Sequence, residues 1–202
     1  MDFQSTLFAG AGQLRFDAIE RTVLSRGAWV DTAQGWLPDA DEVFDALAAR
    51  VPWRSERRAM YDRVVDVPRL VHTYLAAEAL PHPVLDQARD GLSAHYRDEL
   101  GEPFVTAGCC YYRDGRDSVA WHGDTIGRGR SHDTMVAIVS VGDPRRLTLR
   151  PRGGGRSLVL EMGHGDLVVM GGSCQRTWEH AVPKVAHAGP RMSVQFRPRN
   201  VF

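Results

Sequence analysis

The sequence of 202 residues has almost no lysine. Its 25 basic residues comprise a single lysine, Lys184, and 24 arginines, and 25 acidic residues balance them to a formal net charge of zero. A chain without excess positive charge does not coat nucleic acid by bulk electrostatics, although a local basic patch is compatible with this balance. The preference for arginine is consistent with a coding bias, or with recognition of anions by guanidinium groups, which bind carboxylates and phosphates in a bidentate way.

The chain also has few cysteines and no long apolar segment. Cys109, Cys110 and Cys174 form no CxxC motif, and an odd number argues against a disulfide framework and favours a reducing compartment. No segment approaches the roughly 18 apolar residues of a membrane span, and the first residues lack the features of a signal peptide. We therefore expect a cytoplasmic protein with no membrane partner, and a monomer because no dimer-forming stripe is evident.

The length and the 43% of hydrophobic residues fit one globular domain over residues 1–202. We expect extended segments over 14–37, and a helix over 39–50 with Asp39 as its N-cap. A second helix is predicted over 83–99, followed by a stop at Gly101. Residues 51–75, rich in arginine and aromatic residues, show no clear period and are predicted to form an exposed, partly ordered segment.

From Phe104 onward, short β-type runs alternate with turn signals such as Asp114-Gly115 and Gly171-Gly172. The predicted strands cover 104–112, 117–121, 134–141, 146–150, 157–161, 166–170, 177–182 and 191–197. About eight short strands at this spacing are typical of a sandwich or a jelly-roll barrel. We therefore predict an α+β, mainly β, domain with helices and a lid-like segment in residues 1–100 and a jelly-roll core in residues 101–202.

Three residues of the β region predict a metal site. His122 and Asp124 form a His-x-Asp pair whose side chains point to the same side, and His180 from a later strand can complete the set. Two histidines and one carboxylate on one face are the ligands of non-haem Fe(II) oxygenases. The pair alone is a weak signal in a chain with eight histidines. A surface histidine beside a solvated aspartate and a zinc-binding jelly roll are the alternatives.

Two arginines follow these residues at a regular spacing. Arg191 and Arg197 are six residues apart on one predicted strand, so their side chains point to the same side and can hold a dicarboxylate through bidentate contacts. The sequence order of His-x-Asp, His, Arg and Arg is the order in which a 2-oxoglutarate-dependent iron oxygenase needs these groups.

Together these motifs resemble the AlkB family of nucleic-acid demethylases. The resemblance covers about residues 50–202, and it is carried by Tyr111–Asp124, His164–Gly172, Trp178–Lys184 and Pro190–Arg197. It implies a double-stranded β-helix core in which Fe(II) is bound by His122, Asp124 and His180. It implies further that 2-oxoglutarate is bound by Tyr112, Arg191, Ser193 and Arg197, and that Arg197 is catalytic together with the three metal ligands.

The activity implied by the resemblance is a dioxygenase reaction that uses O2. The enzyme would split 2-oxoglutarate to succinate and CO2 and hydroxylate an N-methyl group on a base, which leaves as formaldehyde. The methylated base must leave the stack to reach the iron, and damaged pairing lowers the free-energy cost of flipping it. The implied partner is methylated DNA or RNA, and the implied role is repair of alkylation damage.

The resemblance also gives residues 51–75 the role of a nucleotide-recognition lid. It implies substrate contacts from Tyr61, Arg63, Arg69 and Tyr74, with Tyr61 as an aromatic finger near the gap in the duplex. The arginines of this segment are candidates for phosphate contacts, as is a second run comprising Arg145, Arg146, Arg150, Arg152 and Arg156. The alternatives are that Trp53 and Tyr61 anchor the lid to the core and that the second run is a solvated hairpin.

Two positions depart from the family's pattern. Cys110 stands two residues before Tyr112, where the family usually has an asparagine whose amide helps to hold 2-oxoglutarate; packing is the commoner role for such a thiol. Ile126 stands where relatives with strong repair activity often carry an acid that receives a cationic base.

Three hypotheses for the function follow. The chain is a demethylase of alkylated nucleic acid, which the arginines of the lid favour. It is an Fe(II)/2-oxoglutarate oxygenase for a protein or a small molecule. Or it is a catalytically silent nucleic-acid-binding relative, against which the intact metal and co-substrate residues argue.

Overall fold

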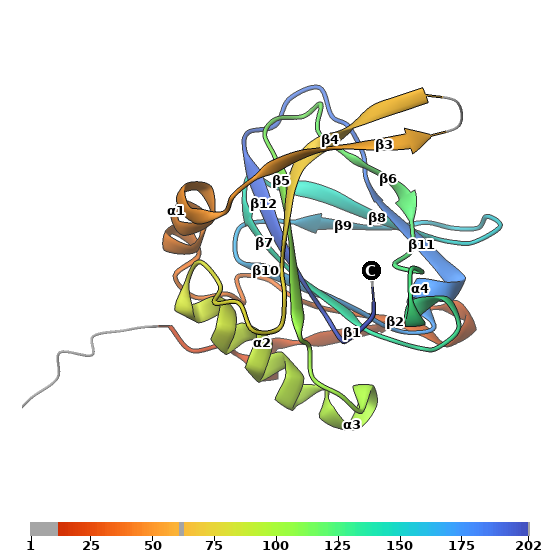
Figure 1. Ribbon diagram of the computed structural model, residues 1–202. Helices are drawn as coiled ribbons and strands as arrows, with labels where there is room; N and C mark the ends of the chain where they lie inside the picture. Colours follow the sequence, from red (N-terminus) through yellow and green to blue (C-terminus); the bar gives the residue numbers. More distant parts are fainter. Residues whose placement is uncertain (1–11, 61–62, 202) are drawn as a thin grey trace, which may run out of the picture.

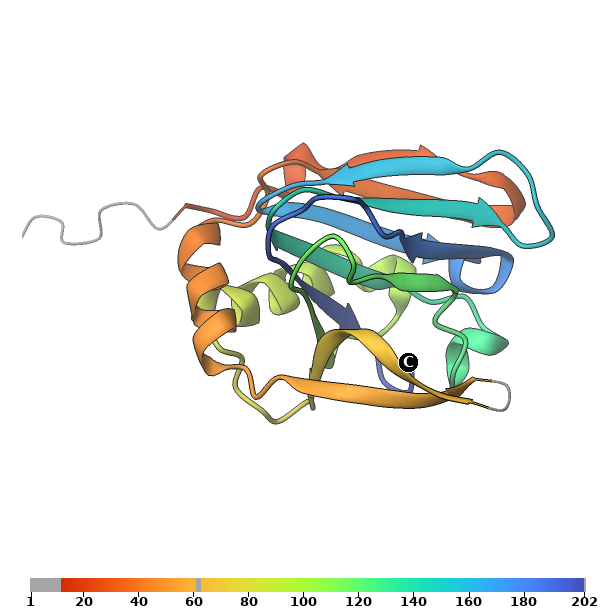
Figure 2. The ribbon, with the colours of Figure 1, turned by 90° about the horizontal axis from the view of Figure 1, so that it is seen from above.

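The computed structural model describes residues 12–60 and 63–201, and for residues 57–60 and 63–66 it describes only the backbone. In this part of the chain, antiparallel strands form an eight-stranded and a four-stranded sheet that face each other (Figures 1 and 2). The large sheet has the order β1 (Glu20–Val23), β2 (Ala28–Ala33), β10 (Asp166–Gly172), β7 (Val136–Gly142), β12 (Arg191–Arg197), β5 (Thr106–Tyr112), β4 (Arg63–Tyr74) and β3 (Arg54–Met60). The small sheet has the order β6 (Val119–His122), β11 (Trp178–Val182), β8 (Arg145–Pro151) and β9 (Leu158–Met162).

The helices are α1 (Ala40–Arg50), α2 (Pro83–His95), α3 (Arg97–Leu100) and α4 (Cys174–Thr177). Buried residues of α1 and α2, such as Val43, Leu47 and Leu85, pack with Val139 and Val194 of the large sheet in one hydrophobic cluster. The helices therefore cover the face of the large sheet that is turned away from the small sheet (Figure 2). None of the helices in the described residues is long and apolar enough to cross a membrane.

Strand β12 shows how the sequence divides the interior into two compartments. Met192, Val194 and Phe196 belong to the apolar cluster on the helix side of the sheet. The residues between them point into the space between the two sheets, where they line a polar cavity. Because side chains alternate along a strand, one seven-residue segment supplies both hydrophobic core and functional groups.

The predicted mainly β, jelly-roll architecture is confirmed, and each of the eight predicted strands has a counterpart whose ends agree within two residues. The two predicted helices are present as α1 and as α2 followed by α3. Asp39 is the N-cap residue of α1, as predicted, but its side chain does not cap the helix. Asp39 has φ of 53°, its side chain makes no capping hydrogen bond, and only its carbonyl oxygen accepts from Val43 N, at 2.9 Å.

Residues 51–75 were expected to be an exposed, partly ordered segment without regular structure, but their described part contains two long strands. Strands β3 and β4 pair with each other as a hairpin, which continues the large sheet because β4 pairs with β5 from Leu70 to Tyr74. Trp53 fixes the start of the hairpin, since its indole Nε1 donates to Leu47 O at 3.1 Å and its ring lies 5.4 Å from that of Tyr111. These contacts agree with the interpretation of Trp53 as an anchor of the segment. Tyr61 lies outside the described residues.

Candidate functional site

The predicted metal ligands lie together at one end of the small sheet. His122 is the last residue of β6 and is paired in register with His180 of β11. One donor atom from each of His122, Asp124 and His180 lies within 4.8 Å of the others. Asp124 and His180 are buried, whereas His122 is half-exposed at the mouth of the site.

Neighbouring groups orient each ligand toward a common point. His122 Nδ1 lies 2.9 Å from Ala120 O, which assigns a proton to Nδ1 and leaves Nε2 for a metal, 3.7 Å from Asp124 Oδ1. Arg197 Nε donates to Asp124 Oδ2 at 2.9 Å, and the backbone N–H of Asp124 donates to Gln175 Oε1 at 2.9 Å. This donor set of two imidazoles and a carboxylate fits Fe(II).

The electrostatics of the site keep both buried ligands in the forms that bind a metal. Burial alone would raise the pKa of Asp124, but the charges of Arg197, His180 and His122 outweigh burial and hold the pKa at about 2. Burial, with help from the charge of His122, lowers the pKa of His180 to about 3. Asp124 is therefore a carboxylate and His180 a neutral imidazole at neutral pH, as metal binding requires.

A cavity continues from these ligands into the space between the sheets. Its polar lining comes from one face of three adjacent strands of the large sheet and from the two histidines: Arg69, Cys110, Tyr112, Arg191, Ser193, Gln195, Arg197, His122 and His180. Gly108 on β5 makes room for this lining, because a Cβ there would lie 2.7 Å from the Arg197 guanidinium. The cavity thus joins a metal site to a group of cationic and hydroxyl side chains.

Arg191 is the most buried cation of this lining, with only 3% of its surface exposed. Its Nε donates to Ser140 Oγ at 2.9 Å, and its guanidinium lies 5.0 Å from the centre of the Tyr112 ring. Burial lowers the pKa of Arg191 and raises that of Tyr112 to about 12, so the phenol stays neutral. Among the described residues, Arg191 forms no ion pair with a carboxylate, which leaves it available to an anionic ligand.

The structure brings the predicted iron and 2-oxoglutarate residues together at one cavity. Of the predicted substrate residues, one lines this cavity and another lies on the opposite face of the sheet. Arg69 lines the cavity from β4. Tyr74 lies on the other face of β4, where it packs on the helix-side core and its ring lies 4.5 Å from that of His72. The structure thus does not bring Tyr74 to the cavity. Arg63 begins β4, but its side chain, like all of Tyr61, is outside the described part of the structure.

Cys110 lines the cavity and also packs against the hydrophobic cluster between the two sheets, so the packing interpretation is confirmed but gives only part of its contacts. Its thiol accepts a hydrogen bond from Arg69 Nε at 3.4 Å and donates to Gln195 Oε1 at 3.7 Å. The alternation of β5 was the available signal, because Cys110 and Tyr112 have the same parity on one strand. Gln175, which holds the backbone of Asp124, was missed because nothing in the local sequence links it to the metal ligands.

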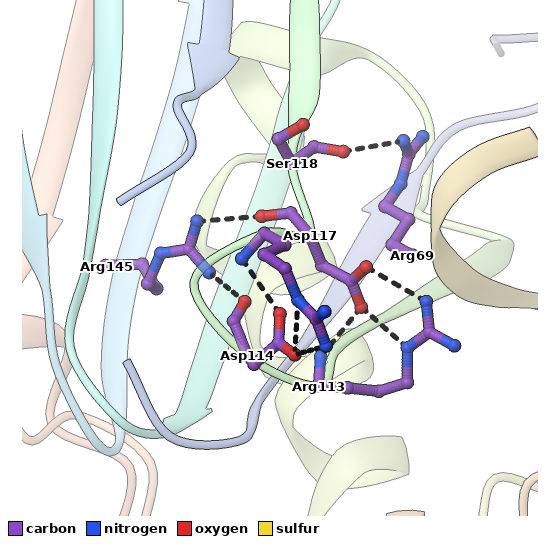
Figure 3. Close-up of polar contacts among 7 residues, drawn as sticks. Arg69, Arg113, Asp114, Asp117, Ser118 and Arg145 are labelled. Carbon is purple, nitrogen blue, oxygen red and sulfur yellow. Dashed lines mark hydrogen bonds and ion pairs between the residues drawn. The ribbon is translucent and has the colours of Figure 1, made fainter. Parts of the chain in front are cut away.

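The second arginine run is not a free basic loop, because other strands supply its partners. Arg145 is buried and donates to the carbonyl oxygens of Asp114, Asp117 and Pro183 at 3.1, 2.9 and 2.8 Å (Figure 3 shows the first two residues). Arg146 pairs with Glu161 of β9, and Arg150 pairs with Glu179 of β11 at 2.6 Å. These three arginines are thus already engaged within the protein, which disfavours phosphate contacts from them.

Comparison with known proteins adds a family to this geometry. Residues 76–197 match the family model described as the 2OG-Fe(II) oxygenase superfamily. The fold is similar to that of a 2OG-Fe(II) family oxidoreductase from Burkholderia pseudomallei, with a TM-score of 0.58, 18% identity, and coverage of 85% of this chain and 86% of that chain.

Two curated relatives are similar in sequence. The alpha-ketoglutarate-dependent dioxygenase alkB homolog 3 of Bos taurus is 30% identical over 181 residues, which cover 80% of this chain and 62% of the relative. The DNA oxidative demethylase ALKBH2 of Arabidopsis thaliana is 28% identical over 192 residues, which cover 76% of this chain and 60% of the relative. The chain therefore spans about three fifths of the length of these relatives.

Proposed function

Because this chain belongs to the 2OG-Fe(II) oxygenase superfamily, which uses Fe(II), 2-oxoglutarate and O2, we propose that it is a dioxygenase that removes N-methyl groups from bases in DNA or RNA. The resemblance to the AlkB family is confirmed by the curated relatives. The observation that carries the proposal is one cavity in which His122, Asp124 and His180 adjoin the unpaired guanidinium of Arg191.

The residues of the cavity divide the work between them. His122 Nε2, the Asp124 carboxylate and the His180 imidazole would hold Fe(II), while Arg191 and Tyr112 would hold the distal carboxylate of 2-oxoglutarate. Arg197 keeps Asp124 in one orientation through its hydrogen bond. Bound Fe(II) supplies the oxidising chemistry that converts 2-oxoglutarate, O2 and an N-methyl group into succinate, CO2 and an N-hydroxymethyl group, which releases formaldehyde.

The nucleic-acid substrate is supported by the relatives and by the shape of the site. One curated relative is named as a DNA oxidative demethylase. The metal ligands lie at one end of a cavity between two sheets, so a base must leave its stack to reach them. We propose alkylation repair by a cytoplasmic monomer as the setting of this reaction.

Formaldehyde release tests the proposal directly. The full chain, supplied with Fe(II), 2-oxoglutarate and O2, is incubated with DNA and RNA oligonucleotides that carry 1-methyladenine or 3-methylcytosine, and formaldehyde and succinate are both measured. We expect the two products in equal amounts. His122→Ala should abolish both, and Arg191→Ala should raise the 2-oxoglutarate requirement steeply, whereas Arg146→Ala on the small sheet should change neither. Full turnover by His122→Ala would contradict the metal assignment.

A second candidate is an oxygenase for a protein or a small molecule. Ile126, 65% exposed just after the metal-binding segment, favours it, because an apolar side chain cannot pair with a cationic methylated base. In the same assay, succinate formation without formaldehyde from any of the oligonucleotides would favour this candidate over the demethylase.

A further inference from the structure

Four arginines approach the cavity between the sheets, and they differ in what neutralises them. Arg197 pairs with Asp124 at 2.9 Å. Arg145, whose guanidinium lies 5.6 Å from the ring centre of Tyr112, donates to three backbone carbonyl oxygens. Arg191 and Arg69 form no ion pair with a carboxylate in the described part of the chain. Arg145 also has no carboxylate partner, but it does not line the cavity, so Arg69 and Arg191 are the lining cations without a bonded counter-charge among the described residues.

Arg69 makes two hydrogen bonds among the described residues, one to a sulfur atom and one to a backbone carbonyl oxygen, and neither acceptor is a carboxylate. Its Nε donates to Cys110 Sγ at 3.4 Å, and its Nη1 donates to Ser118 O at 3.3 Å (Figure 3 shows the second contact). Burial alone would lower the pKa of Arg69, but the charges of Cys110, Tyr112 and Glu56 offset burial and raise it. A half-buried guanidinium in this situation has lost water without gaining an anion, which is unfavourable unless a ligand supplies the negative charge.

The strand registers place Arg69 at the end of the cavity away from the metal. Val71 pairs with Cys110 and Leu70 with Tyr111, so the register continued by one residue puts Arg69 beside Tyr112 on the cavity face. On the other side of β5, Arg191 is the register partner of Tyr112. The two cavity-lining arginines without a carboxylate partner therefore flank the same phenol. Arg197, beside the metal ligands, is the register partner of Thr106 at the opposite end of β5.

We propose that Arg69 is a second ligand of the distal carboxylate of 2-oxoglutarate, which it binds together with Arg191. This proposal rests on the proposed co-substrate but not on the nucleic-acid substrate. Arg69 takes over the contact that an amide at the position of Cys110 would make, and the Cys110 thiol and the Ser118 carbonyl hold the guanidinium in place. The role differs from the phosphate contact expected of Arg69 from the sequence.

Direct binding of the co-substrate tests this proposal without turnover. The full chain is loaded with Mn(II), and its affinity for 2-oxoglutarate and for 2-oxopentanoate is measured by calorimetry without nucleic acid. The second ligand has a methyl group in place of the distal carboxylate. We expect Arg69→Gln to weaken 2-oxoglutarate binding by about tenfold to a hundredfold, the range for a lost charge-assisted hydrogen bond, and to leave 2-oxopentanoate binding unchanged. Arg69→Lys should restore part of the loss.

The controls separate a contact from a structural effect. Arg54→Gln, on the exposed part of the same hairpin, should bind both ligands like the wild type. Equal weakening of both ligands by Arg69→Gln, or no change in 2-oxoglutarate affinity together with weaker binding of an oligonucleotide, would overturn the proposal. A wild-type chain that binds 2-oxoglutarate but releases no formaldehyde from methylated oligonucleotides rejects the demethylase function and leaves the role of Arg69 intact.

Discussion

The metal site depends on residues that donate no ligand atom. Gly123 separates His122 from Asp124, and a Cβ at this position would lie 2.5 Å from the carbonyl oxygen of Gln175 and 2.6 Å from the Arg152 guanidinium. The backbone oxygen cannot move without moving the helix α4 that follows Ser173. The close approach therefore sets the distance between β6 and the segment that also supplies the side-chain acceptor for Asp124 N–H.

Gly123→Ala should consequently weaken metal binding. The added methyl group would push the 122–124 segment away from Gln175 and disturb the convergence of the ligands, so we expect Mn(II) affinity to fall by about tenfold to a hundredfold, as for other losses of support around a metal. Calorimetric titration of the metal measures this effect. Gly163→Ala in the β9–β10 turn, where a Cβ meets only the flexible Asp166 side chain at 3.2 Å, is the matched control. Equal affinities of the two variants would contradict the argument.

Among the elements, the β5–β6 connection links the two halves of the site. It joins Tyr112, at the end of β5, to the strand that ends in His122. Asp117 in this connection is 4% exposed and accepts from the backbone N of Arg113 at 2.9 Å and from its Nε at 2.8 Å (Figure 3). Buried Arg145 binds two carbonyl oxygens of the same connection, so the loop is fixed from both sides.

Asp117→Asn should destabilise the fold through this loop. The amide leaves the Arg113 guanidinium without its carboxylate and forces a mismatched buried hydrogen bond, which costs about 1–3 kcal/mol of unfolding free energy. Urea denaturation measures the difference. Asp114→Asn provides the control, because Asp114 pairs with the 88% exposed side chain of Arg116 and should contribute much less. An Asp117→Asn variant as stable as the wild type would show that the loop does not depend on this carboxylate.

At this scale, sequence periodicity explains what could be predicted. Side chains alternate along a strand, and this rule needs only the local sequence. It correctly places Arg191 and Arg197 on one face of their strand and directs His122 and Asp124 to the same side. The β3–β4 hairpin was missed because its β4 strand gains order from pairing with β5, a contact distant in sequence. The partners of Arg145 likewise come from two other segments of the chain, which no local pattern reveals.

For the molecule as a whole, the buried site links folding to pH. In the folded protein, His180 has a pKa of about 3 against an ordinary value of 6.5, and Asp124 has a pKa of about 2 against 3.8. Both pKa values are lower than in the unfolded chain, so the unfolded state binds more protons when the pH falls. Metal binding opposes this effect at neutral pH, because it adds free energy to the folded state that holds the deprotonated ligands.

The metal-free protein should therefore lose stability progressively below about pH 6.5, where His180 takes up a proton only on unfolding. The loss from this one group has a slope of at most about 1.4 kcal/mol per pH unit, and the Asp124 contribution begins only below about pH 4. Urea denaturation of the chelator-treated protein between pH 7 and 4.5 measures the slope. His180→Gln should flatten it, whereas His132→Gln, which removes an exposed histidine, should retain it. A slope that is identical in wild type and His180→Gln would mean that burial of His180 does not govern the acid sensitivity.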